Sequence, residues 1–305
     1  MGDAAKSMTE DEVLAIRAWP QRLGPYEAFG QRYEIWTNDA ALAGFLHELY
    51  DVMTVAEHRE QGAPMGRIYR VLGPTDERRG VVMRDDSIIG SSEQSARIIE
   101  SLQWAINRQV IIGACADRLI LHAGGVVRDG VAIVLPAVME SGKTTLTTGL
   151  LDRGCGYLSD EAIAVDHDLT VEGYPKPLSI DPGSWDLFRH HEPMVAPPLQ
   201  GYLEQQWQVA VAPIAPVVRT SQLGALVFPT YAAGATTTLE AMSPATVVSQ
   251  GAHCTFVPPS STIPTARLRD IAAIAAAVPV YRLISGDLQE ACDAVLSVFE
   301  QVAGQ

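Results

Sequence analysis

The sequence of 305 residues predicts an α/β fold built on a mixed sheet, and two features of residues 117–154 predict it. The apolar segment 131–136 ends at a proline and leads through a Gly-Lys-Thr turn into a helical pattern, as strands do before phosphate-binding loops. The segment is itself the second half of a hairpin, because an apolar run and a tight Asp-Gly turn come before it. Parallel α/β sheets alternate strands with helices, so a hairpin at this point predicts that parallel and antiparallel strands share one sheet.

Composition limits the classes of function. Hydrophobic residues make up 47% and charged residues 19% of the chain, as in soluble globular proteins. The net charge of −14 disfavours nucleic acids and anionic membranes as partners. No apolar run reaches the roughly 20 residues that span a bilayer, and the first 24 residues lack the apolar stretch of a signal peptide. The four cysteines are far apart, so we expect reduced thiols in a cytoplasmic protein.

Residues 1–91 are predicted to form a small α+β region. A helix capped by Asn38 or Asp39 should present Leu42, Phe45, Leu46 and Leu49 on one face. The other elements expected here are a short helix within residues 10–23 and strands at 32–37, 66–73 and 79–90.

Residues 92–305 are predicted to form the larger domain, opening with a long helix over 92–115. After the loop, a helix over 142–154 should bury Leu146, Leu150 and Leu151 and end at Gly154. A second hairpin follows, formed by strands at 162–166 and 170–180. The remaining prediction is a short helix at 182–192, an extended segment at 196–218, strands at 223–231, 236–243 and 279–286, and helices at 243–253, 263–278 and 287–303.

The loop itself predicts nucleotide binding. Backbone N–H groups at a helix N-terminus form a concave anion site, Lys143 would reach the β- and γ-phosphates, and the hydroxyl of Thr144 would bind Mg²⁺. Gly142 would let the backbone approach phosphate closely. An acid at Glu140 is compatible with this site, since elongation-factor GTPases carry one at the same place in their loops. The predicted cofactor-binding residues are Ala137, Val138, Met139, Glu140, Ser141, Gly142, Lys143, Thr144 and Thr145.

Acidic residues after a strand would complete a phosphoryl-transfer site. The segment GYLSDEAIAV places Asp160 and Glu161 after such a strand. In phosphoryl transfer one acid can hold Mg²⁺, directly or through water, and another can accept the proton of the attacking hydroxyl. These two carboxylates are therefore candidates for the two roles.

The chain resembles the HPr kinase/phosphorylase family in three ordered motifs, here LHAGGV, AVMESGKT and LSDEAIAV. It is most similar to shorter HPr-kinase-like proteins of bacterial peptide natural-product clusters, including lasso-peptide kinases. Their loops have the form LPxPSGAGKSTL and are followed by LSDE and YPKPLS. This chain has LPAVMESGKTTL, LSDE and YPKPLSI, and the resemblance covers about residues 115–300.

The resemblance implies a mixed-sheet kinase core of the phosphoenolpyruvate carboxykinase type with ATP and Mg²⁺ as cofactors. It implies that Lys143 and Thr144 bind the triphosphate and Mg²⁺, and that His122 lies near the transferred phosphate. It further implies Asp160 as the base and Glu161 as the acid on the metal side. Where the family has Ser and Gly, this chain has Met139 and Glu140.

The function predicted from these features is a kinase that phosphorylates a hydroxyl, with a serine of a ribosomally made precursor peptide as acceptor. Two alternatives stay open: a kinase of a free amino acid or other small hydroxyl-bearing metabolite, and a non-catalytic nucleotide-binding accessory protein. The choice between ATP and GTP also stays open. Members of the family form oligomers, so a homo-oligomer is among the implied partners.

Several further residues are assigned only as candidates. His122 is either a structural or a functional histidine. Lys176 is interpreted as a solvated loop lysine in preference to a contact for the acceptor. His190 and His191 are interpreted as a helix end and not as metal ligands. A phosphate clamp could come from any of Arg219, Arg267, Arg269 and Arg282.

Overall fold

A computed structural model describes residues 8–9, 12–13, 19–56, 66–138, 141–259 and 261–303. The chain divides into two compact units: unit 1 comprises Met1–Val110 and Ser179–Ala210, and unit 2 comprises Ile111–Leu178 and Val211–Gln305. These units do not follow the boundary expected at residue 91. Helix α3 (Ser95–Ala114) has most of its length in unit 1, since Tyr69 of the N-terminal sheet donates a hydrogen bond to its Ala105 carbonyl.

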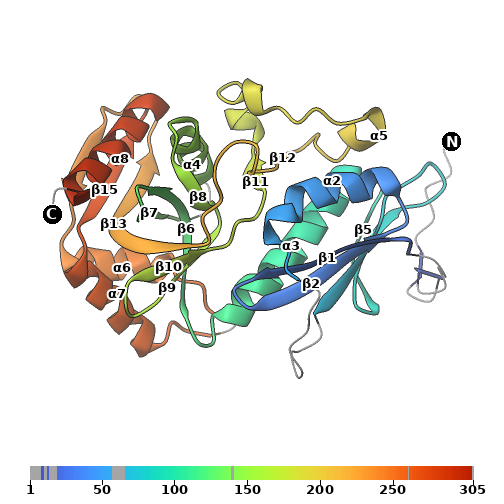
Figure 1. Cartoon of the computed structure of the whole chain (residues 1–305), viewed down its shortest axis with the longest axis horizontal. Helices are drawn as coiled ribbons and strands as arrows, with labels where there is room; N and C mark the ends of the chain where they lie inside the picture. The colour runs from blue at the N-terminus through green and yellow to red at the C-terminus, as the bar shows by residue number, and fades with distance from the viewer. Residues whose placement is uncertain are drawn as a thin grey trace. The chain divides into compact units, whose positions relative to one another are not determined.

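Unit 1 contains a five-stranded sheet with one face against helices α2 and α3 (Figure 1). Only the β2–β3 pair is parallel. The sheet has the order β1-β2-β3-β4-β5, with the strands at Gln21–Ala28, Gln31–Thr37, Arg67–Leu72, Gly80–Arg84 and Ser87–Ser92.

Helix α2 (Ala40–Tyr50) forms as its sequence predicts. The Asp39 side chain caps it by accepting hydrogen bonds from the backbone N–H groups of Ala41 and Leu42. The four apolar residues of the predicted face are all buried. The short η1 turn (Asp51–Met53) follows directly.

One N-terminal prediction needs correction, and another falls mostly outside the described residues. The single strand expected over 79–90 is two strands, β4 and β5, joined at Asp85, which takes a left-handed φ of 53°. An Asp-Asp pair can turn here because a short polar side chain tolerates that conformation. Of the helix predicted within 10–23, residues 21–23 belong to β1 and most of the rest lies outside the described residues.

The segment from 179 to 210 returns to unit 1 and is irregular. The helix predicted at 182–192 is wrong: this stretch contains two single 3₁₀ turns, η2 (Pro182–Ser184) and η3 (Arg189–His191). The segment expected to be extended contains the one-turn helix α5 (Pro197–Gln200) and strand β12 (Trp207–Val209), which pairs with β11 (Leu178–Ile180). Trp185 and Trp207 stack with their ring centroids 4.9 Å apart.

Unit 2 contains an eight-stranded mixed sheet, as predicted. Strand β13 pairs in parallel with both β7 and β15, whereas the hairpins β6–β7 and β9–β10 are antiparallel. The strands are β6 (Leu119–Arg128), β7 (Val131–Pro136), β8 (Gly156–Ser159), β9 (Ala162–Val165), β10 (Thr170–Gly173), β13 (Thr220–Tyr231), β14 (Thr238–Ala241) and β15 (Val280–Ser285).

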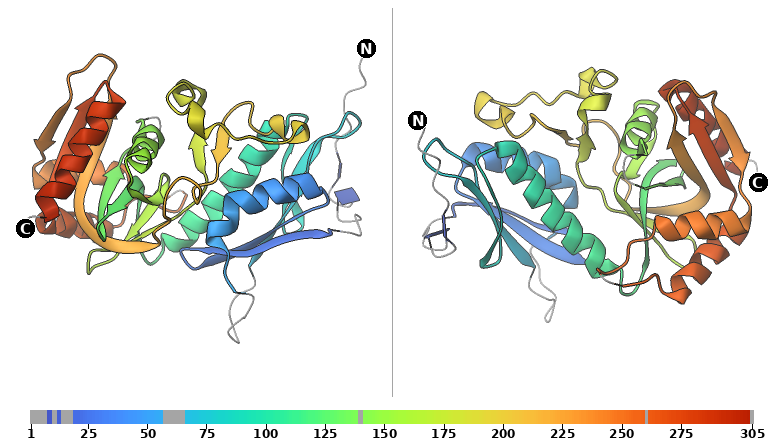
Figure 2. Two further views of the ribbon diagram at one scale, coloured as in Figure 1. Left: turned by 45° about the horizontal axis from the view of Figure 1, so that its top comes forward. Right: turned by 180° about the vertical axis from the view of Figure 1, so that it is seen from behind.

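The β6–β7 hairpin turns at Asp129 and Gly130, whose φ angles of 51° and 79° are those that an Asp-Gly pair adopts in a two-residue hairpin turn. Helices cover both faces of the sheet (Figure 2). One face packs against α4 (Lys143–Asp152) and α8 (Leu288–Ala303). The main apolar core lies on the other face, where α6 (Pro244–His253) and α7 (Thr265–Ala277) pack.

The terminal helices of unit 2 follow local signals in the sequence. The Asp287 side chain accepts a hydrogen bond from the Glu290 N–H at the start of α8, as the predicted cap requires. Gly154 follows α4 with a left-handed φ of 85°. No helix within the described ranges is both long and apolar enough to cross a membrane.

Candidate nucleotide site

The predicted loop lies between β7 and α4 in unit 2 (Figure 1). The Ala137 N–H donates to the His122 carbonyl over 3.1 Å, so the start of the loop is joined to β6. Gly142 caps α4 with a φ of 83°, a left-handed conformation that favours glycine over every other residue. The predictions for Met139 and Glu140 lie outside the described residues.

Lys143, the first residue of α4, is buried at 6% exposure. Its ammonium donates a hydrogen bond of 2.7 Å to the Val138 carbonyl within the same loop. Burial lowers the pKa of Lys143, while the carboxylates of Glu161 and Asp160 act in the opposite direction. The Lys143 ammonium therefore lies within the loop. A phosphate oxygen could replace the Val138 carbonyl as its hydrogen-bond acceptor.

Asp160 follows β8 and is almost fully buried, at 3% exposure. Its Oδ2 accepts a hydrogen bond of 3.1 Å from the Thr144 hydroxyl. Its Oδ1 lies 2.9 Å from the Tyr157 hydroxyl and 3.0 Å from the Lys176 ammonium. The carboxylate is thus held on one side by two partners and faces α4 with the other oxygen.

The prediction that Lys176 is solvent-exposed is wrong. Lys176 is 5% exposed and not a solvated loop lysine, because its ammonium binds Asp160 and also donates to the Pro177 carbonyl at 3.0 Å. A signal in the sequence could have found it. The chain has 19 arginines and only three lysines, and two of the three lysines, Lys143 and Lys176, are buried at this site.

Tyr157 is a second residue that the sequence analysis missed. Its hydroxyl lies 2.9 Å from the Lys176 carbonyl as well as from Asp160 Oδ1, and it accepts a hydrogen bond from the Asp160 N–H. Tyr157 therefore joins the end of β8 to the chain between β10 and β11. We refer to Tyr157, Asp160 and Lys176 together as the carboxylate clamp.

Glu161 and His122 form the more open side of the site. Glu161 Oε1 lies 3.9 Å from His122 Nε2, and the two side chains are 28% and 16% exposed. Ser159 shapes the acidic turn, since its hydroxyl accepts hydrogen bonds from the N–H groups of Glu161 and Ala162. Burial raises the pKa of Glu161, against the opposing charge of Lys176.

His122 is held as a neutral imidazole. Burial, and then the positive charge of Lys143, lower its pKa to about 4. The ring also lies against Phe256, with centroids 5.2 Å apart. A neutral imidazole next to Glu161 can donate or accept a hydrogen bond, but it adds no positive charge at neutral pH.

The Gly-Gly pair after His122 has a packing reason. A Cβ on Gly124 would lie 2.5 Å from Thr147 Oγ1 of α4, and a Cβ on Gly125 would collide with Ile163 of β9. The two glycines therefore let α4 and β9 approach β6 closely beside His122.

The described residues fit a bound triphosphate and its Mg²⁺. The first N–H groups of α4 have no acceptor within the helix and face the loop, as in anion sites at other helix N-termini. Ser141 Oγ, in the loop, is buried and has no hydrogen-bond partner among the described residues. Thr144 and Asp160 supply a hydroxyl and a carboxylate, which are hard oxygen donors of the kind Mg²⁺ prefers.

Of the candidate arginines for a phosphate clamp, Arg267 already has partners elsewhere in unit 2. Arg267 binds Asp270 at 3.1 Å and the Ala116 carbonyl at 3.2 Å, so its guanidinium is engaged at the start of α7. Tyr231 lies beside the loop, since its Cβ is 3.4 Å from where a Cβ of Gly142 would be, and the residue is 64% exposed.

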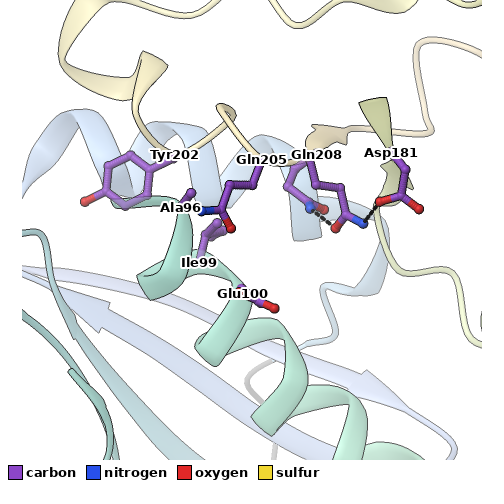
Figure 3. Close-up of a pocket in the computed structure, with 8 residues that line it drawn as sticks. Ala96, Ile99, Glu100, Asp181, Tyr202, Gln205 and Gln208 are labelled. Carbon is purple, nitrogen blue, oxygen red and sulfur yellow. Dashed lines mark hydrogen bonds between the residues drawn. The ribbon is translucent and has the colours of Figure 1, made fainter. Parts of the chain in front are cut away.

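Unit 1 has a cavity of about 160 Å³ that contains none of these residues (Figure 3). Glu100 and Asp181 contribute carboxylates to its lining. A chain of hydrogen bonds runs from Gln103 through Gln208 and Gln206 to Asp181, so the amides along its wall are already paired with one another. We attribute the polarity of this cavity to the packing of the 179–210 segment.

No protein-family model matches the sequence, and no curated protein matches it. Among solved structures, the HPr(Ser) kinase/phosphatase from Coxiella burnetii is similar to this chain, with 12% identity and a TM-score of 0.30. The match covers 61% of this chain and 93% of that one.

Proposed function

We propose that this chain is an ATP- and Mg²⁺-dependent kinase that phosphorylates a hydroxyl group. The observation that carries the proposal is the hydrogen bond of 3.1 Å between Thr144 and Asp160 next to the buried Lys143. In P-loop sites of phosphoryl transfer, a lysine of the loop contacts the phosphates, and a loop Ser or Thr hydroxyl and an Asp carboxylate hold the metal. Thr144 belongs to α4 and Asp160 follows β8, so the contact joins residues 16 positions apart in the chain.

The geometry supports roles for the two acids that are the reverse of those implied by the family resemblance. Asp160 has one oxygen on Thr144 and the other in the carboxylate clamp, so we assign it to the metal side. Glu161 is more exposed and lies beside His122, and burial raises its pKa. We therefore assign Glu161 to accept the proton of the attacking hydroxyl, because a carboxylate with a raised pKa is the stronger base.

The other residues bind and orient. Lys143 and the first N–H groups of α4 would hold the triphosphate, and Thr144 with Asp160 would hold the metal. His122, neutral at physiological pH, would orient Glu161 or the acceptor through a hydrogen bond. Bound Mg²⁺-ATP supplies the phosphoryl group and offsets the negative charge of the reacting oxygens.

For the acceptor, we propose a serine of a ribosomally made precursor peptide, on the strength of the LSDE and YPKPLSI motifs. Calorimetric titration of Mg²⁺-ATP into wild type and Lys143→Ala tests the nucleotide site first. We expect binding in wild type and its loss in the variant. Phosphopeptide mass spectrometry with candidate peptides, and with free serine in parallel, then distinguishes a peptide kinase from a kinase of small metabolites.

The two acids can be tested separately. Glu161→Gln should bind Mg²⁺-ATP as wild type does and fail in transfer, whereas Asp160→Asn should lose the benefit of Mg²⁺ for ATP binding. The opposite pattern would return the acids to the roles that the resemblance implies. Absence of nucleotide binding in wild type, with peptide present or absent, would refute the proposed kinase. Binding without transfer to any acceptor would favour an accessory protein.

A further inference from the structure

The use of lysine in this chain is selective. Arginine outnumbers lysine by 19 to 3, and two of the three lysines are buried near the loop. Lys143 has an evident reason, because it begins the helix that would receive phosphate. Lys176 comes from the connection between β10 and β11, and nothing in the proposed function yet accounts for it.

The contacts of Lys176 are directed at Asp160. Its ammonium lies 3.0 Å from Asp160 Oδ1 and 3.0 Å from the Pro177 carbonyl, and its side chain is 7% exposed. The Asp160 side chain is 1% exposed. Burial of both charges is costly unless they pair, so each side chain compensates the buried charge of the other.

The hydrogen bonds of the clamp also fix the direction in which Asp160 points. Tyr157 and Lys176 both bind Oδ1, and this leaves Oδ2 directed at the Thr144 hydroxyl. An aspartate without these partners could rotate about χ2, since that torsion is broad. The clamp thus sets which oxygen is available to α4.

We propose that Lys176 is a positioning residue, which holds the Asp160 carboxylate oriented so that Asp160 and Thr144 together bind the metal of a metal–nucleotide complex. This inference rests on the proposed function. It assigns no phosphate contact to Lys176, because the ammonium is engaged on the far side of the carboxylate. Lys176 acts on the metal through Asp160, as outer residues around metal sites commonly do.

The test compares ATP affinity by calorimetry in Mg²⁺ and in EDTA, for the full-length protein. We define the metal ratio as the dissociation constant of ATP in EDTA divided by that in Mg²⁺. This ratio measures how much the metal contributes to ATP binding. We expect Lys176→Met to lower this ratio by roughly 10- to 100-fold, the usual loss when an outer residue of a metal site is removed. Lys176→Arg should recover part of the ratio, since it keeps the charge.

A double-mutant comparison separates positioning from direct phosphate binding. In the Asp160→Asn background, Lys176→Met should leave the metal-free ATP affinity within about twofold, since residues that act as a unit are not additive. A further loss of tenfold or more in that background would show a direct phosphate contact and overturn the inference.

Arg118→Met is the matched control. It removes ion pairs with Asp166 and Glu172 of the β9–β10 hairpin, also in unit 2, and should leave the metal ratio unchanged. If Lys176→Met does not fold, Tyr157→Phe removes the other partner of Oδ1 and should lower the ratio in the same direction.

The outcomes distinguish failure of the kinase proposal from failure of the inference about Lys176. Wild type that fails to bind ATP in Mg²⁺ refutes the proposed function and the inference with it. Wild type that binds, with a metal ratio unchanged in Lys176→Met or in Tyr157→Phe, refutes the inference alone and leaves the kinase proposal standing.

Discussion

Unit 1 packs four tyrosine rings against one another, whereas unit 2 buries two lysines and an aspartate beside a loop. In unit 1 the centroids of neighbouring rings lie 5.5–6.3 Å apart, among Tyr26, Tyr33, Tyr50 and Tyr69. Burial raises the pKa of Tyr26, Tyr50 and Tyr69, so these phenols stay neutral. Among the described residues, the buried charged side chains are Lys143, Asp160 and Lys176, all in unit 2.

This difference concerns what it costs to bury polar groups. A tyrosine core stabilises a fold by area and ring contacts, and each hydroxyl needs at most a local acceptor. Buried charges stabilise little or nothing in net terms and demand exact partners. Their concentration around one loop in unit 2 is therefore best explained by chemistry, and the polar groups of unit 1 by packing.

The largest expected effect is on turnover. Lys143→Met should lower phosphoryl transfer by a factor on the order of 10²–10³ or more, because it removes the cation that faces the phosphates. The fold should persist, because the Lys143 ammonium donates its hydrogen bond to a loop carbonyl, that of Val138. Steady-state kinetics and circular dichroism measure both. Full turnover in this variant would break the assignment of charge in unit 2 to catalysis.

The next effect is on stability. Asp160→Ala leaves the Lys176 ammonium buried without its carboxylate, which should cost about 3–5 kcal/mol of unfolding free energy. Asp166→Ala is the control, because that partner of Arg118 is 44% exposed and should contribute less than about 1 kcal/mol. Urea unfolding measures both variants. Equal losses would show that burial of the clamp is energetically unimportant.

A pH effect follows from His122, whose pKa falls from the ordinary value of 6.5 to about 4. Between those values the unfolded chain takes up a proton that the native protein does not, so this histidine makes stability fall as pH falls from 6.5 towards 4. NMR should show the His122 ring neutral down to about pH 5, with His122→Gln identifying its signal. Titration of the ring near 6.5 would contradict the buried, neutral imidazole.

The smallest effect concerns unit 1. The Tyr69 hydroxyl lies 3.1 Å from the Ala105 carbonyl and 2.8 Å from Gln109 Oε1. Tyr69→Phe should cost about 1 kcal/mol in urea unfolding and leave the ATP affinity unchanged. A changed affinity would mean that the tyrosine core of unit 1 contributes to nucleotide binding, and would weaken the contrast between the units.

The sequence predicted the parts of the fold that local signals determine. The Asp39 and Asp287 caps and the Asp129-Gly130 turn are set by a few neighbouring residues, and all three form as expected. The parallel pairing of β13 with β7 and β15 joins residues 54 to 92 positions apart, and no local pattern encodes it. The same holds for the inclusion of residues 179–210 in unit 1.

For the candidate site, local patterns in the sequence predicted the loop and the acid pair, but they did not predict the burial of Lys176 beside them. A Gly-Lys-Thr turn after a strand and an acid pair after another strand are local patterns, and the structure brings Thr144 and Asp160 together. Lys176 lies in a Pro-Lys-Pro segment that has the composition of an exposed loop. Its burial depends on Tyr157, which is 19 residues away and holds the Lys176 carbonyl.

Gly124 and Gly125 affect how the results of mutagenesis near His122 should be interpreted. A methyl group at 124 would press on α4 and one at 125 on β9, so the absence of a side chain at both positions has a packing reason. A saturation-mutagenesis map would therefore show two intolerant positions next to His122, a pattern easily mistaken for catalytic residues. The absence of side chains at 124 and 125 sets how closely α4 and β9 approach β6, and engineering of that spacing would begin with these two positions.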